Sequence, residues 1–211
     1  MYTKELYLAG GPACGLQEVF SRIPGVVETT AGTAESVSGN SGFEGVVECV
    51  RVSYNPKKIA IDTMLNLFFT VVNPYTNGIQ GKAEGPLYRS AVLYTSHEDI
   101  SQLSYFFTFI QNRGNKDQIY EETLVVNEYE GTPRVRPKVV TKLCELASFE
   151  PYEEARQHLL RKDPEAYTPI DIGLLEKVGV LKETGIVAEG DTCNASAHQR
   201  INFISLDVKN S

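Results

Sequence analysis

The fold is decided by residues 4–32, which read KELYLAGGPACGLQEVFSRIPGVVETTAG. Residues 4–8 alternate in polarity, which is typical of a β-strand, and a Gly-Gly-Pro breaker follows them. Residues 14–23 carry apolar side chains at helical spacing, and the Pro-Gly pair at 24–25 ends the predicted helix. Residues 26–32 are rich in β-branched side chains and predict a second strand.

The elements that follow complete a known topology. The sequence predicts a strand at 46–54, a helix at 60–72 and a strand at 88–94. Together with the first stretch, these elements give the split β-α-β-β-α-β order. We therefore predict an α/β (α+β) two-layer sandwich, with a ferredoxin-like core, helices on one face of the sheet and long coil segments.

The remaining chain predicts one domain over residues 1–168, with an inserted hairpin near 120–146, and a C-terminal extension over 169–211. The helix expected at 151–161 is polar, and its charged side chains, Arg156 among them, are expected to face solvent. The other expected elements are a helix at 99–111, strands at 124–128 and 139–146, and a short helix at 171–181.

The composition excludes several classes of partner. The 211 residues carry a net charge of -7, and the basic residues form no cluster, so we expect no nucleic acid as a partner. The longest apolar stretches, such as 65–72, are far shorter than the roughly 20 residues that cross a bilayer, so we expect no membrane partner. Residues 1–11 do not resemble a signal peptide, and we predict a cytoplasmic protein.

The four cysteines are Cys14, Cys49, Cys144 and Cys193, and they are far apart in the sequence. None belongs to a Cys-x-x-Cys pair, so the spacing typical of a zinc site is absent. We expect free thiols in a reducing compartment, with neither a metal nor a cofactor.

Several short segments follow one another in the order and spacing of a known family. They are LAGG at 8–11, GLQEVF at 15–20, RIPGV at 22–26, ECVRVSYNP at 48–56, QG at 80–81 and YRSA at 88–91. The chain thereby resembles the A-type peptide methionine sulfoxide reductases over about residues 6–96, and again more weakly over 149–167. The resemblance implies a substrate that contains methionine sulfoxide, or a small molecule, and the same ferredoxin-like sandwich.

The resemblance also implies a changed active site. Members of the family reduce the S-epimer of methionine sulfoxide with the cysteine of a Gly-Cys-Phe-Trp-Gly motif at the start of the first helix. The five positions here hold Gly11, Pro12, Ala13, Cys14 and Gly15. Pro12 therefore stands in place of the nucleophile, and Ala13 and Cys14 stand in place of the two aromatic residues that contact the substrate's methyl group.

Other positions of the family's site are also changed. Thr33 stands in place of a tyrosine, Asn73 in place of an aspartate, and residues 155–157 read Ala-Arg-Gln in place of Tyr-His-Gln. Glu48 holds the position of the family's acid. The residues expected to contact substrate are Pro12, Ala13, Thr33, Asn73 and Tyr88.

Sulfoxide reduction needs a thiolate that attacks sulfur and an acid that protonates the oxygen. Cys14 is the thiol nearest the changed motif, and Glu48 shares an apolar strand face with valines, so these two are the expected catalytic residues. The alternatives are a small packed cysteine and a carboxylate that faces solvent. By the resemblance, Cys193 is a candidate resolving cysteine, the alternative being a simply exposed thiol, and a thioredoxin-like protein is a candidate reductant.

Three functions remain open at this point. The chain is a divergent peptide-methionine (S)-S-oxide reductase with Glu48 in its pocket, a repurposed non-redox enzyme acting on a small metabolite in that pocket, or a non-catalytic member that binds a ligand or partner. The replacement of the nucleophile weighs against the first function, and the presence of Glu48 weighs against the third.

Overall fold

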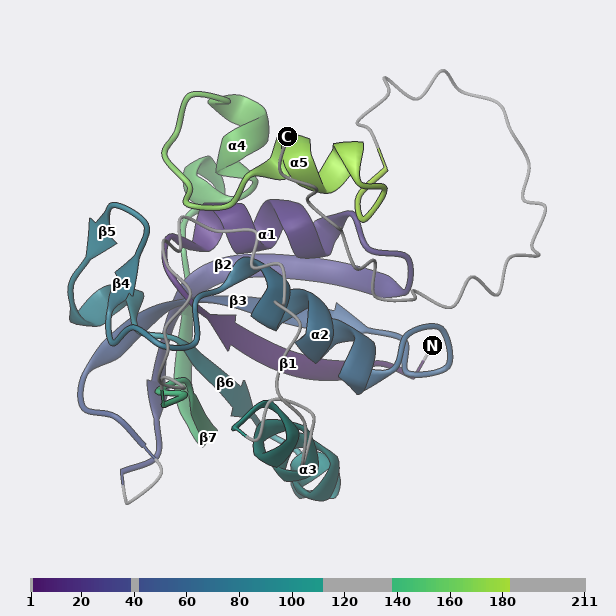
Figure 1. Ribbon diagram of the computed structural model, residues 1–211, viewed down its shortest axis with the longest axis vertical. Helices are drawn as coiled ribbons and strands as arrows, with labels where there is room; N and C mark the ends of the chain where they lie inside the picture. Colours follow the sequence, from purple (N-terminus) through teal and green to yellow (C-terminus); the bar gives the residue numbers. More distant parts are fainter. Residues whose placement is uncertain (1, 39–41, 112–137, 183–211) are drawn as a thin grey trace, which may run out of the picture.

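The computed structural model describes residues 2–38, 42–111 and 138–182. Within these ranges, five strands form a closed barrel in the order β1-β3-β2-β7-β6 (Figure 1). A separate small sheet pairs β4 (Ile79–Gln80) with β5 (Ala83–Glu84). The barrel strands are β1 (Lys4–Ala9), β2 (Val26–Ser36), β3 (Val46–Tyr54), β6 (Ala91–Tyr94) and β7 (Lys142–Pro151).

The helices cover the outside of the barrel, and Figure 1 shows α4 and α5 on the far side of α1 from β2. None of the helices in the described ranges is both long and apolar enough to cross a membrane. The α-helices are α1 (Ala13–Ser21), α2 (Ile61–Val71), α3 (Ile100–Gln111), α4 (Leu159–Lys162) and α5 (Ile172–Lys177). The short 3-10 helices in the described part of the chain are η1 (Pro86–Tyr88), η2 (His97–Asp99) and η3 (Glu154–Arg156).

The predicted ferredoxin-like two-layer sandwich is wrong, because the sheet closes into a barrel. The first strands and helices follow one another as predicted, but β7 then pairs antiparallel with β2 and parallel with β6. These pairings satisfy the backbone groups that an open sheet would leave at its two edges. No local pattern predicts them, because the paired strands are far apart in sequence.

Two other predicted elements also differ from the structure. The strand expected at 139–146 overlaps β7, which begins later, at Lys142, and ends later, at Pro151. The strand expected at 124–128 and most of the inserted hairpin lie outside the described residues. The helix expected at 151–161 is wrong: β7 ends at Pro151, and η3 and α4 follow as separate short helices. His158 has a φ of 50°, a left-handed conformation that interrupts a right-handed helix.

Two apolar clusters fill the two sides of the sheet, because successive side chains of a strand point to opposite faces. Leu6 and Leu8 of β1 belong to the larger cluster, which packs the barrel against the helices. The smaller cluster takes residues from all five barrel strands and therefore fills the barrel interior; its members are Tyr7, Ala9, Ala34, Val47, Cys49, Ala91, Leu93 and Cys144. Burial raises the pKa of Cys144 to about 11 and that of Cys49 well above its usual value.

The pairing of β2 with β7 depends on Gly32. A Cβ atom at this position would lie 2.3 Å from the carbonyl oxygen of Glu150 and 2.8 Å from the ring of Phe149. The register places Gly32 opposite Pro151, at the end of β7. Only glycine lets the two backbones approach this closely.

We expect Gly32→Ala to lower the free energy of unfolding by about 1–3 kcal/mol, because the obstructing atom belongs to the backbone and must move. Urea denaturation followed by circular dichroism measures the change. Gly173→Ala is the matched control, since a Cβ there meets nothing closer than 3.6 Å and alanine favours the helix. Equal unfolding midpoints for Gly32→Ala and the wild type would contradict this account of the barrel closure.

Candidate functional site

The turn between β1 and α1, with the start of α1, holds residues 11–15, Gly-Pro-Ala-Cys-Gly. Gly11 has a φ of 85°, a conformation that favours glycine, and its N–H donates to the carbonyl oxygen of Tyr88 at 3.3 Å. Pro12 follows at the N-cap with a φ of -57°, and α1 begins at Ala13. Proline suits this place because the first N–H groups of a helix have no partner within the helix. The turn is therefore fixed in position, but Pro12 offers no side-chain nucleophile.

Glu48 of β3 faces this turn and is only 8% exposed. Its Oε2 accepts a hydrogen bond from the Ala13 N–H at 2.8 Å, at the N-terminus of α1. Its Oε1 accepts from the Tyr152 hydroxyl at 2.9 Å and from an Arg156 nitrogen at 3.4 Å. Both oxygens thus act as acceptors, and one of them lies at the helix N-terminus, which carries partial positive charge.

Sequence reasoning missed Tyr152 and Arg156. The guanidinium carbon of Arg156 lies 3.4 Å from the centre of the Tyr152 ring, so the cation stacks on the ring while it pairs with Glu48. The interpretation of Arg156 as a purely solvent-facing residue is therefore wrong, although half of its side chain is exposed. Burial raises the pKa of the Tyr152 hydroxyl to about 12, and the negative charge of Glu48 contributes to this shift.

Gln157 holds this segment against the barrel. Its side-chain oxygen accepts from the backbone N–H of Ala31 and from the amide of Gln17, each at 2.8 Å. Its side-chain nitrogen donates to the carbonyl oxygens of Ala31 and Tyr152, each at 2.9 Å. These bonds tie α1, β2 and the chain after β7 together, which places Tyr152 and Arg156 beside Glu48. Gln157, which matches the Gln of the family's Tyr-His-Gln triplet, was the sequence signal that could have pointed to this segment.

Cys14 lies in the first turn of α1, and its thiol donates to the carbonyl oxygen of Tyr167 at 3.6 Å. The side chain is partly buried. Burial raises the pKa of the thiol above its ordinary value, and the negative charge of Glu48 raises it further. The structure thus brings Cys14 and Glu48 into one electrostatic environment, but this environment disfavours the thiolate.

The other predicted residues have different surroundings. Thr33 is the cross-strand partner of Glu48 in the β2–β3 register, so the two side chains share a face of the sheet. Asn73 is buried, and its side-chain oxygen accepts from the N–H of Tyr75 at 2.9 Å, which stabilises its own loop. Tyr88 contacts the motif through its carbonyl oxygen. Cys193 lies outside the described residues.

In the part of the chain that the structure describes, no group of three or more histidine, cysteine or acidic residues is arranged to hold a metal ion. The contacts of the site are those of hydrogen-bond donors around the Glu48 carboxylate.

The barrel strands and the Glu48 site both lie within the range that one family of proteins covers. The model of the peptide methionine sulfoxide reductase family matches residues 4–184. The chain therefore belongs to the peptide methionine sulfoxide reductase family.

Individual relatives agree with this assignment. A peptide methionine sulfoxide reductase MsrA from Clostridium botulinum (strain Hall) is 28% identical over 176 residues, which cover 80% of this chain and 99% of the relative. Mxr1 from Saccharomyces cerevisiae in its reduced form shares the fold at a TM-score of 0.60 and 23% identity, over 79% of this chain and 89% of its own. Methionine sulfoxide reductase A of Corynebacterium diphtheriae shares it at 0.57 and 20% identity, over 79% and 78%.

The raised pKa of Cys14 predicts slow alkylation at neutral pH. We expect the rate of iodoacetamide modification at Cys14, resolved by peptide mass spectrometry, to have its pH midpoint above that of an ordinary cysteine thiol. Glu48→Gln should lower this midpoint, because it removes a nearby negative charge that disfavours the thiolate.

Glu154→Gln is the matched control for this measurement, since its side chain is 92% exposed. It should leave the midpoint unchanged. Modification of wild-type Cys14 well below pH 8 would show that the thiol is activated, contrary to this expectation.

Proposed function

We propose that this chain is a divergent member of its family that binds a methionine-sulfoxide group at the Glu48 site without reducing it. The observation that carries the proposal is the combination of a carboxylate surrounded by donors with a proline at the nucleophile's position. Binding a sulfoxide needs donors and shape, whereas reducing it needs a thiolate in addition.

The residue at position 12 bears on whether the sulfoxide can be reduced. Pro12 has no group that can attack sulfur, and positioning of the substrate does not replace a nucleophile. Cys14 is the nearest thiol, but its raised pKa leaves little thiolate at neutral pH, and its hydrogen bond runs to the Tyr167 carbonyl oxygen. These facts favour binding over turnover.

Arg156 supports recognition of the sulfoxide oxygen. A sulfoxide oxygen carries a partial negative charge and accepts hydrogen bonds. Among the described residues, the hydrogen bond to Glu48 uses only part of the Arg156 donor set, and half of the Arg156 side chain is accessible to solvent. Glu48 and the Tyr152 ring hold the guanidinium in place, so that a ligand need not immobilise a long side chain on binding.

A thioredoxin-like reductant would be needed only to reduce a cysteine that turnover had oxidised. With Pro12 in place, no disulfide or sulfenic acid forms at that position, so the wild-type chain does not need such a partner. A reductant becomes relevant for variants that regain the thiol.

We expect the wild type and Cys14→Ser to bind N-acetyl-methionine sulfoxide methylamide equally and to produce no thioether from it with dithiothreitol. Isothermal titration calorimetry measures binding, and chromatography of the product measures turnover. Arg156→Met should weaken binding roughly tenfold or more, because it removes a charged donor. The corresponding thioether should bind more weakly than the sulfoxide for the same reason.

Lys162→Met is the matched control for the lost charge, since that side chain is about as exposed as Arg156. The motif variant Pro12→Cys with Ala13→Phe and Cys14→Trp then shows whether the scaffold supports turnover once a thiol is restored, with its thermal unfolding checked first. Wild-type turnover that Cys14→Ser abolishes would refute the proposal and identify Cys14 as a displaced nucleophile. Equal binding of sulfoxide and thioether would refute the assigned role of Arg156.

A further inference from the structure

The loop between α2 and β4 contains an Asn-Gly pair, in which the exposed Asn77 precedes Gly78. Gly78 has a φ of 76°, the left-handed conformation that favours glycine. A Cβ atom there would also lie 2.6 Å from the carbonyl oxygen of Gly85. The turn into β4 therefore requires a glycine directly after Asn77, and a glycine leaves the backbone nitrogen next to the asparagine side chain unshielded.

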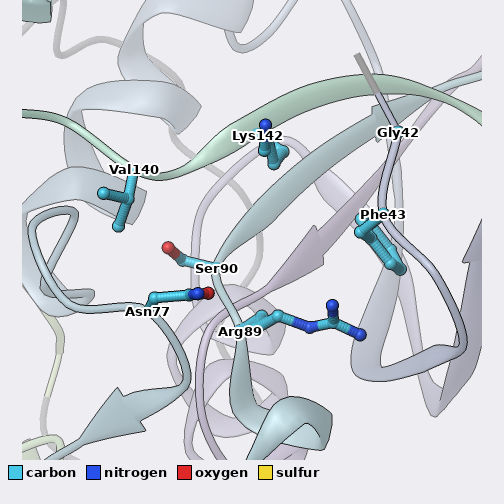
Figure 2. Close-up of a pocket in the computed structure, with 7 residues that line it drawn as sticks. All are labelled: Gly42, Phe43, Asn77, Arg89, Ser90, Val140 and Lys142. Atoms are coloured by element: carbon cyan, nitrogen blue, oxygen red, sulfur yellow. The ribbon is translucent and has the colours of Figure 1, made fainter. Parts of the chain in front are cut away.

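Neither the Asn77 amide nor the Gly78 nitrogen is held by a hydrogen bond. In residues 2–38, 42–111 and 138–182, the Gly78 N–H and the side-chain amide of Asn77 have no hydrogen-bond partner. Figure 2 shows the Asn77 side chain pointing away from its own loop, in the wall of a cavity of about 200 Å³. Because the two groups belong to consecutive residues, rotation within Asn77 alone brings them together.

The loop around this pair is fixed at both ends. The Gln80 side chain is buried, accepts from the Asn73 N–H at 2.9 Å and donates to the Asn73 carbonyl oxygen at 2.8 Å. A Cβ atom on Gly11 would lie 2.9 Å from the Cβ of Gln80, so Gln80 also packs against the turn before α1. The length of main chain between Asn73 and Gln80 therefore decides where β4 lies beside that turn.

Asparagine is a thermolabile residue, and a following glycine hinders its reaction with the backbone least. The Gly78 nitrogen loses its proton to solvent and attacks the side-chain carbonyl carbon of Asn77, and ammonia leaves as the new carbon–nitrogen bond forms. Water then opens the cyclic imide at either of its carbonyl groups. Opening at the side-chain carbonyl gives aspartate. Opening at the main-chain carbonyl gives isoaspartate, whose main chain runs through the former side chain and is one carbon atom longer.

We propose that Asn77-Gly78 is a deamidation site, and that the isoaspartate formed there loosens the β4–β5 hairpin from residues 11–15. The added main-chain atom enters a loop whose ends are held together by Gln80 and Asn73, so it displaces β4 from the turn. None of the described residues that line the cavity is acidic, so a carboxylate at position 77 meets no like charge there. The proposal is independent of the function proposed for the Glu48 site.

The site is tested by incubation of the whole chain in mildly alkaline buffer, beside a sample unfolded in urea, with digestion and peptide mass spectrometry. We expect the folded chain to lose the Asn77 amide at a rate close to that in urea, and synthetic peptides identify the aspartate and isoaspartate products. The rate should rise with pH, because the attacking nitrogen must lose its proton. Asn66 is the internal control and should keep its amide in the folded chain, since it lies within α2, where the next N–H belongs to the helix.

Tryptic cleavage after Lys82 measures the loosening of the hairpin, since the Lys82 N–H donates to the Tyr167 hydroxyl when β4 and β5 are in place. Cleavage should be faster in the incubated wild type than in Asn77→Gln incubated in parallel, because glutamine closes the larger ring much more slowly. Freshly purified Asn77→Asp has the charge without the longer main chain, and it should be cleaved as slowly as Asn77→Gln.

An Asn77 amide that persists in the folded chain while the urea sample loses it would overturn the deamidation site. Equal cleavage of the incubated wild type and Asn77→Gln, with isoaspartate present in the wild type, would overturn its effect on the hairpin. Fast cleavage of fresh Asn77→Asp would show that charge, and not the longer main chain, loosens the hairpin.

Discussion

The close backbone contact between Gly32 and Glu150 is the constraint on which the rest of the structure depends. It lets β7 pair along β2, and the other side of β7 pairs with β6, which closes the barrel. Because β7 ends beside β2, the chain that follows it begins at the barrel wall. The Gln157 side chain then fastens that chain to Ala31 and to α1. The same part of the chain therefore closes the barrel, through β7, and brings Tyr152 beside Glu48.

The N-terminus of α1 is a place where partial positive charge favours an anion. Here the Glu48 carboxylate takes the Ala13 N–H, and the Arg156 cation balances it. The negative charge near the first turn of α1 thus belongs to an oxygen group that the protein itself supplies, and this raises the pKa of the adjacent Cys14.

Local sequence patterns predicted local structure well. The stretch from residue 4 to 32 shows its strand, helix and strand through alternation, helical spacing and a Pro-Gly stop, and the structure places β1, α1 and β2 there. The barrel closure was not predictable in this way, because β7 pairs with partners far away in sequence.

The contact of Arg156 with Glu48 was missed for a related reason. The left-handed His158 breaks the expected helix, and no single-sequence pattern marks that conformation. The family resemblance pointed to the turn at Ala13 and to Glu48, which are hydrogen-bonded in the structure. No pattern in the sequence pointed to Tyr152 as a donor to Glu48.

The two cysteines inside the barrel have a practical consequence. Cys49 and Cys144 come from strands on different parts of the barrel wall, and both are shielded from solvent. A thiol reagent reaches them only when neighbouring strands separate. The rate at which each becomes labelled under native conditions therefore reports how often its own stretch of the wall opens, without denaturant and without an introduced probe.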